Sequence, residues 1–298
     1  MATRELSSAP SMLPLFARAG AAMVPGASKL PFVGGGGGRD VPDLALHLSD
    51  VAIDPDRLSA YNRVCGFDLR DEIPVTYPHI LAFPLQLALM TDPSFPFGAI
   101  GLVHIANRIA QHRSIRSSER LDIVVRATPV EPHPRGKQFS LISEVRVGDE
   151  LVWEEVSTNL KRGGSSENGG KPPGAELPKA EDLPATATWS LGGDLGRRYG
   201  SVSGDLNPIH VHPLTARLFG FKSAIAHGMW TKARCLGALQ ARLPEAFTVE
   251  VAFKKPIFLP GKVEFCEAAV PAAAFDIQFG VRDPRKGSSH LDGRAFSG

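Results

Sequence analysis

Hydrophobic and polar positions follow a helical period most clearly between residues 227 and 244. Apolar side chains recur there at three- and four-residue steps, at Met229, Ala233, Leu236, Leu239 and Leu243. Residues with this spacing share one face of an α-helix, and Pro244 ends the pattern. We therefore expect a helix here that packs an apolar stripe against the rest of the fold.

Strand-like runs follow this helix, and the first half of the chain repeats the order. Runs rich in β-branched and aromatic residues predict strands at 247–258, 261–270, 275–283 and 290–296. In the first half, an apolar run predicts a helix at 79–90, and similar runs predict strands at 101–115, 119–130, 138–149 and 150–162. A long helix laid on an antiparallel sheet is an α+β architecture.

Two pairs of short matches indicate an internal duplication. Residues 61–67, YNRVCGF, share Tyr, Val and Gly at identical spacing with residues 199–205, YGSVSGD. Further on, VHIA at 103–106 matches VEVA at 249–252. Matches in the same order at nearly the same offset favour two related domains.

Glycine-rich and proline-rich segments predict the domain boundaries. A glycine run ends an N-terminal arm at 1–40, which we expect to be a packed arm or helix, because its apolar stretch is too short for a membrane span. A segment rich in Gly, Pro, Ser and charge predicts a linker at 163–184. The two domains are therefore predicted at 41–162 and 185–298.

Composition narrows the class of protein. The 298 residues are 43% hydrophobic and 21% charged, which is typical of a soluble globular protein. The net charge of +2 does not indicate a general nucleic-acid binder. Cys65, Cys235 and Cys266 are far apart, so we expect reduced thiols and a cytoplasmic location. Cys235 and Cys266 lie on apolar elements and are expected to be buried.

The stretch YGSVSGDLNPIH, residues 199–210, carries the candidate chemistry. It places Asp205, Asn207 and His210 within six residues. Pro208 pushes the residue before it toward extended geometry, which argues against a helix. We therefore expect a tight loop, and loops on a rigid scaffold often carry function.

Three interpretations of this loop are open. The first is a catalytic acid/base pair, the second a helix-capping loop that holds a core histidine, and the third part of a metal site. The metal site would be formed by Asp205, His210, His212 and His227. The next short helix is predicted to begin at Pro213, because proline is favoured at the first helical position.

The longer stretch from 203 to 229, SGDLNPIHVHPLTARLFGFKSAIAHGM, resembles the motif of the MaoC-like hydratases, the (R)-specific enoyl-thioester hydratase/dehydratase branch of the hot-dog fold. The resemblance implies an α+β double hot-dog in which only the second half keeps the catalytic loop. It implies reversible water addition to a trans-2-enoyl thioester, giving an (R)-3-hydroxyacyl thioester, in fatty-acid metabolism. The thioester would be carried by coenzyme A or an acyl-carrier protein, and the protein would pair as a homodimer.

The resemblance also implies a role for each residue of the motif. Asp205 and His210 would be the catalytic dyad, with Asn207 supporting the loop. The backbone amide of Gly228 would form an oxyanion hole. Substrate contacts are implied for Ser203, His227, Met229, Lys254 and Lys255. The two lysines would hold phosphates, and no metal or cofactor is needed.

The chain departs from the motif's pattern in two places. In the first half, Phe67 stands where Asp205 stands and Glu72 where His210 stands, so that half would serve as scaffold and acyl-binding wall. Some hydratases carry a serine on the helix after the motif, where this chain has Arg234, Cys235 and Leu236. The rival functions are a hot-dog thioesterase, for which we find no separate carboxylate, and a non-catalytic subunit that binds acyl thioesters.

Overall fold

The structure is a computed structural model that describes residues 2–21, 36, 38–164, 170–271 and 273–297. Most of the glycine run at 34–38, and residues 165–169 of the predicted linker, lie outside the described residues. The chain divides into two compact units, neither of which is continuous in sequence. One consists of 1–52, 78–105 and 119–172, and the other of 53–77, 106–118 and 173–298. The boundaries at 41–162 and 185–298 follow the sequence repeat and stay a prediction.

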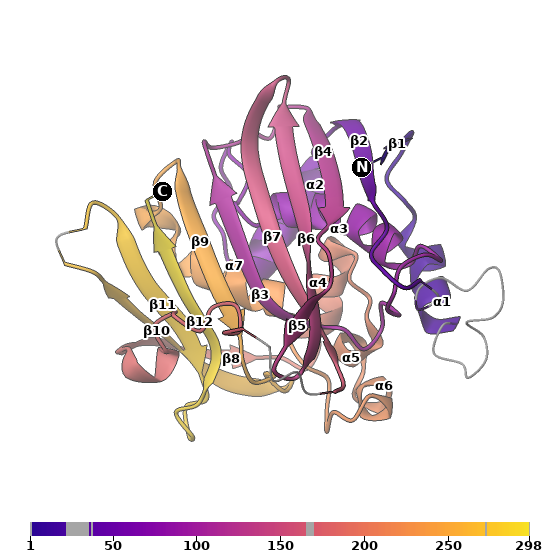
Figure 1. Ribbon diagram of the computed structural model, residues 1–298. Coiled ribbons are helices and arrows are strands. Elements are labelled where there is room, and N and C mark those ends of the chain that lie inside the picture. The colour runs from indigo at the N-terminus through magenta and orange to yellow at the C-terminus, as the bar shows by residue number, and fades with distance from the viewer. Residues whose placement is uncertain (1, 22–35, 37, 165–169, 272, 298) are drawn as a thin grey trace. The chain divides into compact units, whose positions relative to one another are not determined.

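The first unit is built around an antiparallel sheet (Figure 1). Its elements are β1 (Ala2–Leu6), α1 (Met12–Ala21), β2 (Leu44–Val51), α3 (Tyr77–Met90), β4 (Leu121–Ala127), β5 (Glu131–His133), β6 (Gly136–Val147) and β7 (Glu150–Arg162). The strand order is β1-β2-β4-β6-β7, with β5 beside β6. All pairs are antiparallel except β1 with β2. The predicted helix at 79–90 is confirmed, and the N-terminal arm contributes a strand and a helix.

Helix α3 lies on this sheet through both apolar and polar contacts. Its apolar residues include the fully buried Ile80 and Leu85. Gln86 donates to Ser143 on β6 and to Glu155 on β7, at 2.9 Å each. These bonds satisfy polar groups that would otherwise be costly to bury between helix and sheet.

The second unit holds the candidate site. Its elements are α2 (Pro55–Cys65), most of β3 (Val103–Gln111), η2 (Ala180–Asp182), β8 (Ala185–Leu191), α4 (Leu195–Ser203), α5 (Pro208–Val211), α6 (Pro213–Leu218), α7 (Gly228–Leu239), η3 (Gln240–Arg242), β9 (Phe247–Phe253), β10 (Gly261–Ala269), β11 (Asp276–Arg282) and β12 (Ser289–Phe296). The strand order is β3-β9-β12-β11-β10-β8, antiparallel throughout. The sequence pattern did not predict β8, whose side chains are mostly exposed and do not alternate.

Helix α7 confirms the apolar stripe, with one correction. Four of its predicted members are buried, namely Met229, Ala233, Leu236 and Leu239. The helix ends at Leu239 and continues as the 3₁₀ turn η3, so Leu243 lies beyond it. Lys232, on the same helix, is fully buried, and the apolar stripe did not predict this. Its burial is tolerated because its ammonium group donates to the Asn107 side chain and to the carbonyl of Val249. Contacts with β11 and β12 place α7 on the second unit's sheet.

The repeat seen in the sequence has structural counterparts in the second unit. Helices α2 and α4 both end in a left-handed glycine, Gly66 at φ +77° and Gly204 at φ +84°. The matched residues Ala106 and Ala252 face each other across the β3–β9 pair. Equivalent residues lie opposite one another where a two-fold axis relates two copies, which supports a duplication.

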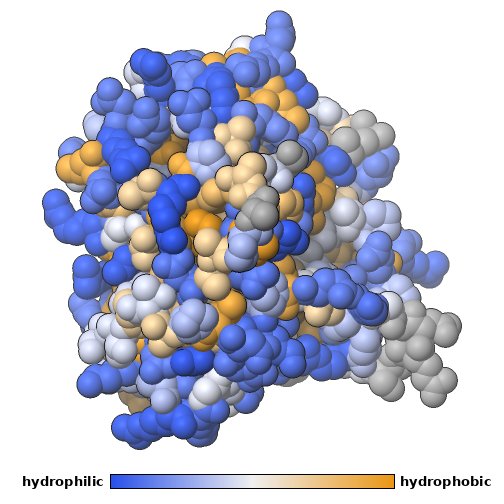
Figure 2. All heavy atoms as spheres, turned by 90° about the vertical axis from the view of Figure 1, so that its left-hand side faces the viewer, coloured by the Kyte–Doolittle hydropathy of each residue, from blue (hydrophilic) through white to orange (hydrophobic). Residues whose placement is uncertain are grey.

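One face of the molecule is predominantly polar. Hydrophilic residues cover most of the face in Figure 2, and hydrophobic ones gather near its middle. Within the described residues, no helix is both long enough and apolar enough to cross a membrane.

Candidate functional site

Helix α4 immediately precedes the candidate loop that begins at Gly204. It ends at Gly204, whose N–H bonds the carbonyl of Gly200 at 2.9 Å, and the left-handed turn there is one that glycine adopts without strain. Gly196, at the other end of α4, lies against the backbone of His210, where a Cβ atom would come within 1.9 Å of the carbonyl oxygen. The loop is therefore packed directly on the helix that precedes it.

The segment after Asp205 is a helical turn, which corrects the expectation of a loop without helix. Asn207 accepts a bond from the N–H of Ile209 at 3.3 Å and so caps the single turn α5. Pro208 occupies the first helical position, where its missing N–H costs nothing. The same proline thus starts a helix, while Asn207 before it keeps a non-helical backbone with φ −53° and ψ 126°. Asn207 also donates its own N–H to the Asp205 carboxylate at 3.1 Å, which holds the carboxylate against the turn.

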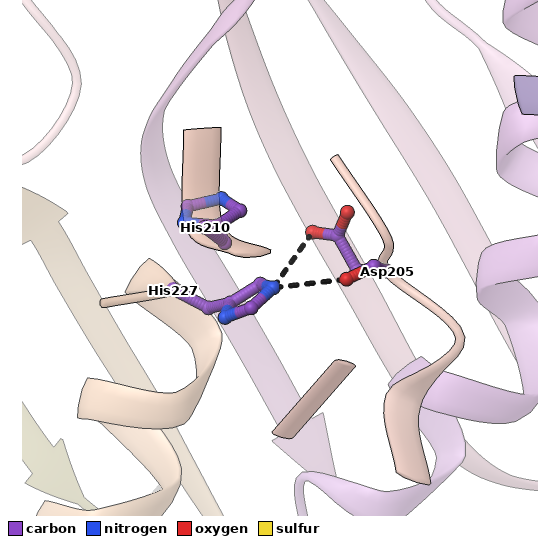
Figure 3. A group of neighbouring side chains, drawn as sticks. All are labelled: Asp205, His210 and His227. Atoms are coloured by element: carbon purple, nitrogen blue, oxygen red, sulfur yellow. Dashed lines mark hydrogen bonds and ion pairs between the residues drawn. The ribbon is translucent and has the colours of Figure 1, made fainter. Parts of the chain in front are cut away.

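Asp205, His210 and His227 form one cluster (Figure 3). One side-chain oxygen or ring nitrogen from each lies within 4.8 Å of the others. The two imidazole rings stack with centroids 3.7 Å apart. His227 Nε2 donates to the Asp205 carbonyl at 3.0 Å and lies 3.8 Å from its carboxylate. Both histidines are buried, whereas 27% of the Asp205 side chain is exposed, so the carboxylate is the member that solvent reaches.

Burial keeps both imidazoles neutral near pH 7. It lowers the pKa of His210 below its ordinary value, against the opposing effects of the Asp205 charge and the Ile225 carbonyl. Burial, with a smaller contribution from His210, lowers the pKa of His227 to about 3. His210 Nδ1 donates to the Ile225 carbonyl at 2.8 Å, so its Nε2 keeps a free lone pair. A neutral imidazole and a carboxylate are thus both available to accept protons.

The N-terminus of α7 borders this cluster. His227 is the capping residue of α7, and Gly228 is its first residue. The first N–H groups of a helix have no carbonyl one turn earlier to bond, and the helix dipole adds positive potential there. A Cβ atom on Gly228 would meet the Phe253 ring at 2.9 Å, so only glycine fits without a shift.

The donor set also fits a metal ion in principle, but one bond counts against it. His227 Nε2, the nitrogen that faces Asp205, donates its proton to the Asp205 carbonyl. A metal at that point would need the lone pair of the same nitrogen. His212 lies outside the cluster, because its Nδ1 accepts from the N–H of Leu214 at 3.1 Å and caps α6.

Comparison with known proteins decides the family. A family model described as MaoC like domain matches residues 173–272. The chain is 36% identical over 252 residues to 3-hydroxyacyl-thioester dehydratase X of Mycobacterium tuberculosis, covering 84% of this chain and 88% of the relative. This chain belongs to the MaoC-like dehydratase family. Membership makes it a hydro-lyase.

Solved structures of MaoC-like proteins agree in fold. HtdX of Mycobacterium tuberculosis superposes with a TM-score of 0.74 at 33% identity, covering 85% of this chain and 99% of that chain. A MaoC-like dehydratase from Phytophthora capsici gives 0.69 at 18% identity, covering 85% and 94%. A Mycobacterium tuberculosis protein described as having a double hotdog fold gives 0.50 at 12% identity, covering 87% and 95%. The double hot-dog fold class is confirmed.

The other residues predicted to contact substrate in this MaoC-like protein, Ser203, Lys254 and Lys255, differ in burial. Ser203 is buried, and its hydroxyl accepts from the Asp205 N–H at 3.1 Å. Lys254 and Lys255 are exposed and follow β9, which ends at Phe253, five residues before the predicted strand end. The Lys254 ammonium lies 3.5 Å from the Asp292 carboxylate. Their contacts with substrate stay predictions.

The positions where some MaoC-like hydratases carry a serine hold other side chains here. The Arg234 guanidinium lies 4.5 Å over the Trp189 ring, and Cys235 is fully buried, with a thiol pKa that burial raises. Thr231, one turn into α7, instead donates its hydroxyl to the His227 carbonyl at 3.1 Å. All three cysteines are free and buried; burial was predicted for Cys235 and Cys266 but not for Cys65.

Sequence reasoning did not find two residues that hold the site. The Tyr199 ring packs against the His227 ring at an interplanar angle of 54°, with centroids 4.9 Å apart, although Tyr199 stands in the repeat match beside the loop. Arg57 bonds carbonyls at the end of α4. Nothing in the local sequence around Arg57 indicates this contact, because 145 residues separate it from Val202.

Proposed function

We propose that the protein catalyses the reversible hydration of trans-2-enoyl thioesters to (R)-3-hydroxyacyl thioesters, with Asp205 and His210 as the catalytic dyad. The observation that carries the proposal is the cluster itself. A carboxylate oxygen of Asp205 and a ring nitrogen of the neutral His210 lie within 4.8 Å of each other, beside the N-terminus of a helix. A carboxylate and an imidazole at this separation suit one shared water molecule, which donates one hydrogen bond to each.

The chemistry requires a proton transfer at each of two adjacent carbons. In hydration, the water oxygen attacks C3 while the dyad takes one of its protons. The α carbon, C2, then receives a proton from the dyad, so the pair is restored and no net proton is exchanged with solvent. Dehydration runs the same steps in reverse. A positioned acid or base of this kind contributes about 10²- to 10⁴-fold in rate.

The thioester oxygen gains negative charge in the enolate-like transition state. The Gly228 amide, at the start of α7, is the donor we assign to that oxygen. A donor of this type contributes about 10²- to 10³-fold, because it is already oriented when the charge develops. His227 orients the Asp205 backbone and, since it stays neutral, adds no competing positive charge.

The substrate class follows from the relatives. The Mycobacterium tuberculosis relative is named a 3-hydroxyacyl-thioester dehydratase, and we extend that substrate to this chain. Coenzyme A and the phosphopantetheine arm of a carrier protein present the same thioester, and both carry phosphates for Lys254 and Lys255. We assign the protein to fatty-acid metabolism in the cytoplasm, acting without metal or cofactor and paired as a homodimer.

The test is the hydration rate of an enoyl thioester by Asp205→Asn and His210→Gln. Each variant should lose at least about 10²-fold in kcat, since each removes one proton acceptor. Asp194→Asn and His212→Gln are matched controls at exposed positions outside the cluster, and both should stay near wild type. Near-normal turnover by Asp205→Asn would refute the dyad. Release of free thiol without hydration would point to a thioesterase.

A further inference from the structure

Helix α2 precedes the catalytic motif by more than a hundred residues, yet it belongs to the second unit and contacts both elements that form the site. It packs against α4, which leads to Asp205, and against α7, which begins at Gly228. The first half of the chain therefore supplies an element of the catalytic unit, in addition to the scaffold role that its missing dyad implies.

Arg57 makes the contact with α4. Its Nε donates to the carbonyl of Val202 at 2.8 Å, and its guanidinium also donates to the carbonyl of Ser203 at 3.4 Å. These are last-turn carbonyls of α4, which have no partner within the helix. A positive charge at a helix C-terminus is also favourable with respect to the helix dipole. The guanidinium thus fixes the two residues immediately before Gly204 and Asp205.

Trp230 makes the contact with α7. Its indole N–H donates to the carbonyl of Val64, near the end of α2, at 3.0 Å. The two helices approach closely, because a Cβ atom on Gly237 would come within 2.7 Å of the Gly66 carbonyl. One helix, α2, therefore contacts both α4, which leads to Asp205, and α7, which begins at Gly228.

We propose that Arg57 is a positioning residue that sets the place of the Asp205 carboxylate relative to His210 and the start of α7. The proposal rests on the proposed function of Asp205. From Arg57, the chain of contacts passes through Ser203, whose hydroxyl accepts the Asp205 N–H. On the other side, Asp205 is held only by its bonds with His227 and Asn207 among the described contacts. Loss of the guanidinium frees the pivot at Gly204, which has no side chain to resist rotation.

Position matters here because both proton acceptors must reach the same water. A displacement of about 1 Å can cost about 10²-fold in rate even when the groups remain present. Substrate affinity depends on other contacts, so Arg57 acts on kcat and leaves KM largely unchanged. A residue that merely stabilised the fold would lower the amount of active protein and alter no kinetic constant of the folded fraction.

The experiment measures kcat per folded molecule and KM for enoyl-thioester hydration by the full-length Arg57→Ala, Arg57→Lys and Arg63→Ala proteins. Arg63 is the matched control, because it is an exposed arginine on the same helix. We expect about a 10- to 100-fold loss of kcat for Arg57→Ala, with KM within about threefold, and an intermediate loss for Arg57→Lys, which offers one point donor in place of the planar fork. Arg63→Ala should stay within about twofold of wild type. Guanidinium at low, non-denaturing concentration should partly restore Arg57→Ala, whereas urea should not.

A kcat for Arg57→Ala within about twofold of wild type would overturn the proposal, as would an equal loss in Arg63→Ala. If Arg57→Ala does not fold, Arg57→Lys decides, and a wild-type kcat for that variant is the overturning result. Asp205→Asn is assayed in parallel. If Asp205→Asn is active, the proposed function is wrong. If Asp205→Asn is inactive and Arg57→Ala is fully active, only the positioning role of Arg57 is wrong.

Discussion

Replacing Gly228 with alanine tests whether the start of α7 is as tightly placed as the proposed oxyanion hole requires. The added Cβ atom would lie 2.9, 3.0 and 3.3 Å from three atoms of the Phe253 ring. Ordinary non-bonded carbon–carbon contacts have separations of about 3.5 Å or more. Either the ring or the first turn of α7 must therefore move by roughly half an ångström.

The effect on stability is the difference of two opposing contributions. Adding a methyl group to a filled site costs about 1–3 kcal/mol through forced shifts. Replacing glycine by alanine within a helix gains up to about 1 kcal/mol. With the full helix gain, the net change is a loss of about 0–2 kcal/mol, and each kcal/mol lowers Tm by about 2–4 °C in a chain of this size.

The effect on catalysis is expected to be larger. An oxyanion donor works at about 2.7–3.1 Å from the oxygen, and complete loss of one donor costs about 10²- to 10³-fold in kcat. A shift of half an ångström moves the amide outside that range without removing it. We therefore expect kcat to fall by about 10- to 100-fold, with a much smaller change in KM.

The assay compares Gly228→Ala, Phe253→Leu and the double variant, by enoyl-thioester hydration and thermal unfolding. Leucine is smaller than phenylalanine, so the double variant has room for the new methyl group. Gly228→Ala should then cost less than about fivefold in the Phe253→Leu background, a coupling typical of residues in contact. Gly20→Ala is the control, because Gly20 lies in α1 with nothing within 4 Å of the added Cβ.

One result would contradict this reasoning. If Gly228→Ala kept wild-type kcat and raised Tm, the helix start would have room for a side chain. The Gly228 amide would then have no tightly defined position, and the oxyanion role would pass to another donor.

The remaining predictions concern the dyad, its protonation, metals and the two units. Asp205→Asn/His210→Gln should be little slower than either single variant, because residues that act as one unit are non-additive; a product of the two single losses would argue for independent roles. Burial lowers the pKa of His210, so the imidazole is neutral at pH 7, and kcat/KM should fall only on acidification below about pH 6.5, the ordinary histidine value; an acidic limb above that pH would contradict the assignment. Hydration should survive exhaustive EDTA treatment, and loss of activity that returns on adding one metal ion per chain would instead favour a His/carboxylate metal site. A fragment of residues 173–298 should be insoluble or nearly inactive, because the second unit also contains 53–77 and 106–118, and co-expression with 1–172 should restore turnover; a fully active fragment would refute that dependence.

The sequence by itself predicted most of the elements and located the candidate site. Helical spacing predicted α7, runs of β-branched and aromatic residues predicted most of the strands, and the repeat predicted two related halves. Asp205, Asn207 and His210 could be found because they lie within six residues, where short-range motifs are informative. Pro208 was read only as a helix breaker, since the capping bond from Asn207 that lets it start a helix depends on backbone geometry.

Only the tertiary structure decided which distant groups complete the site. Burial, which comes from the whole fold, fixes the neutral state of His210 and His227, and the sequence has no local sign of it. Helix α2 belongs to the second unit, although it lies in the first half of the chain. Its bond from Arg57 to Val202 joins residues 145 positions apart. Local patterns report the periodicity of single elements, whereas a contact across such a separation depends on how the elements pack, and packing is a property of the folded chain.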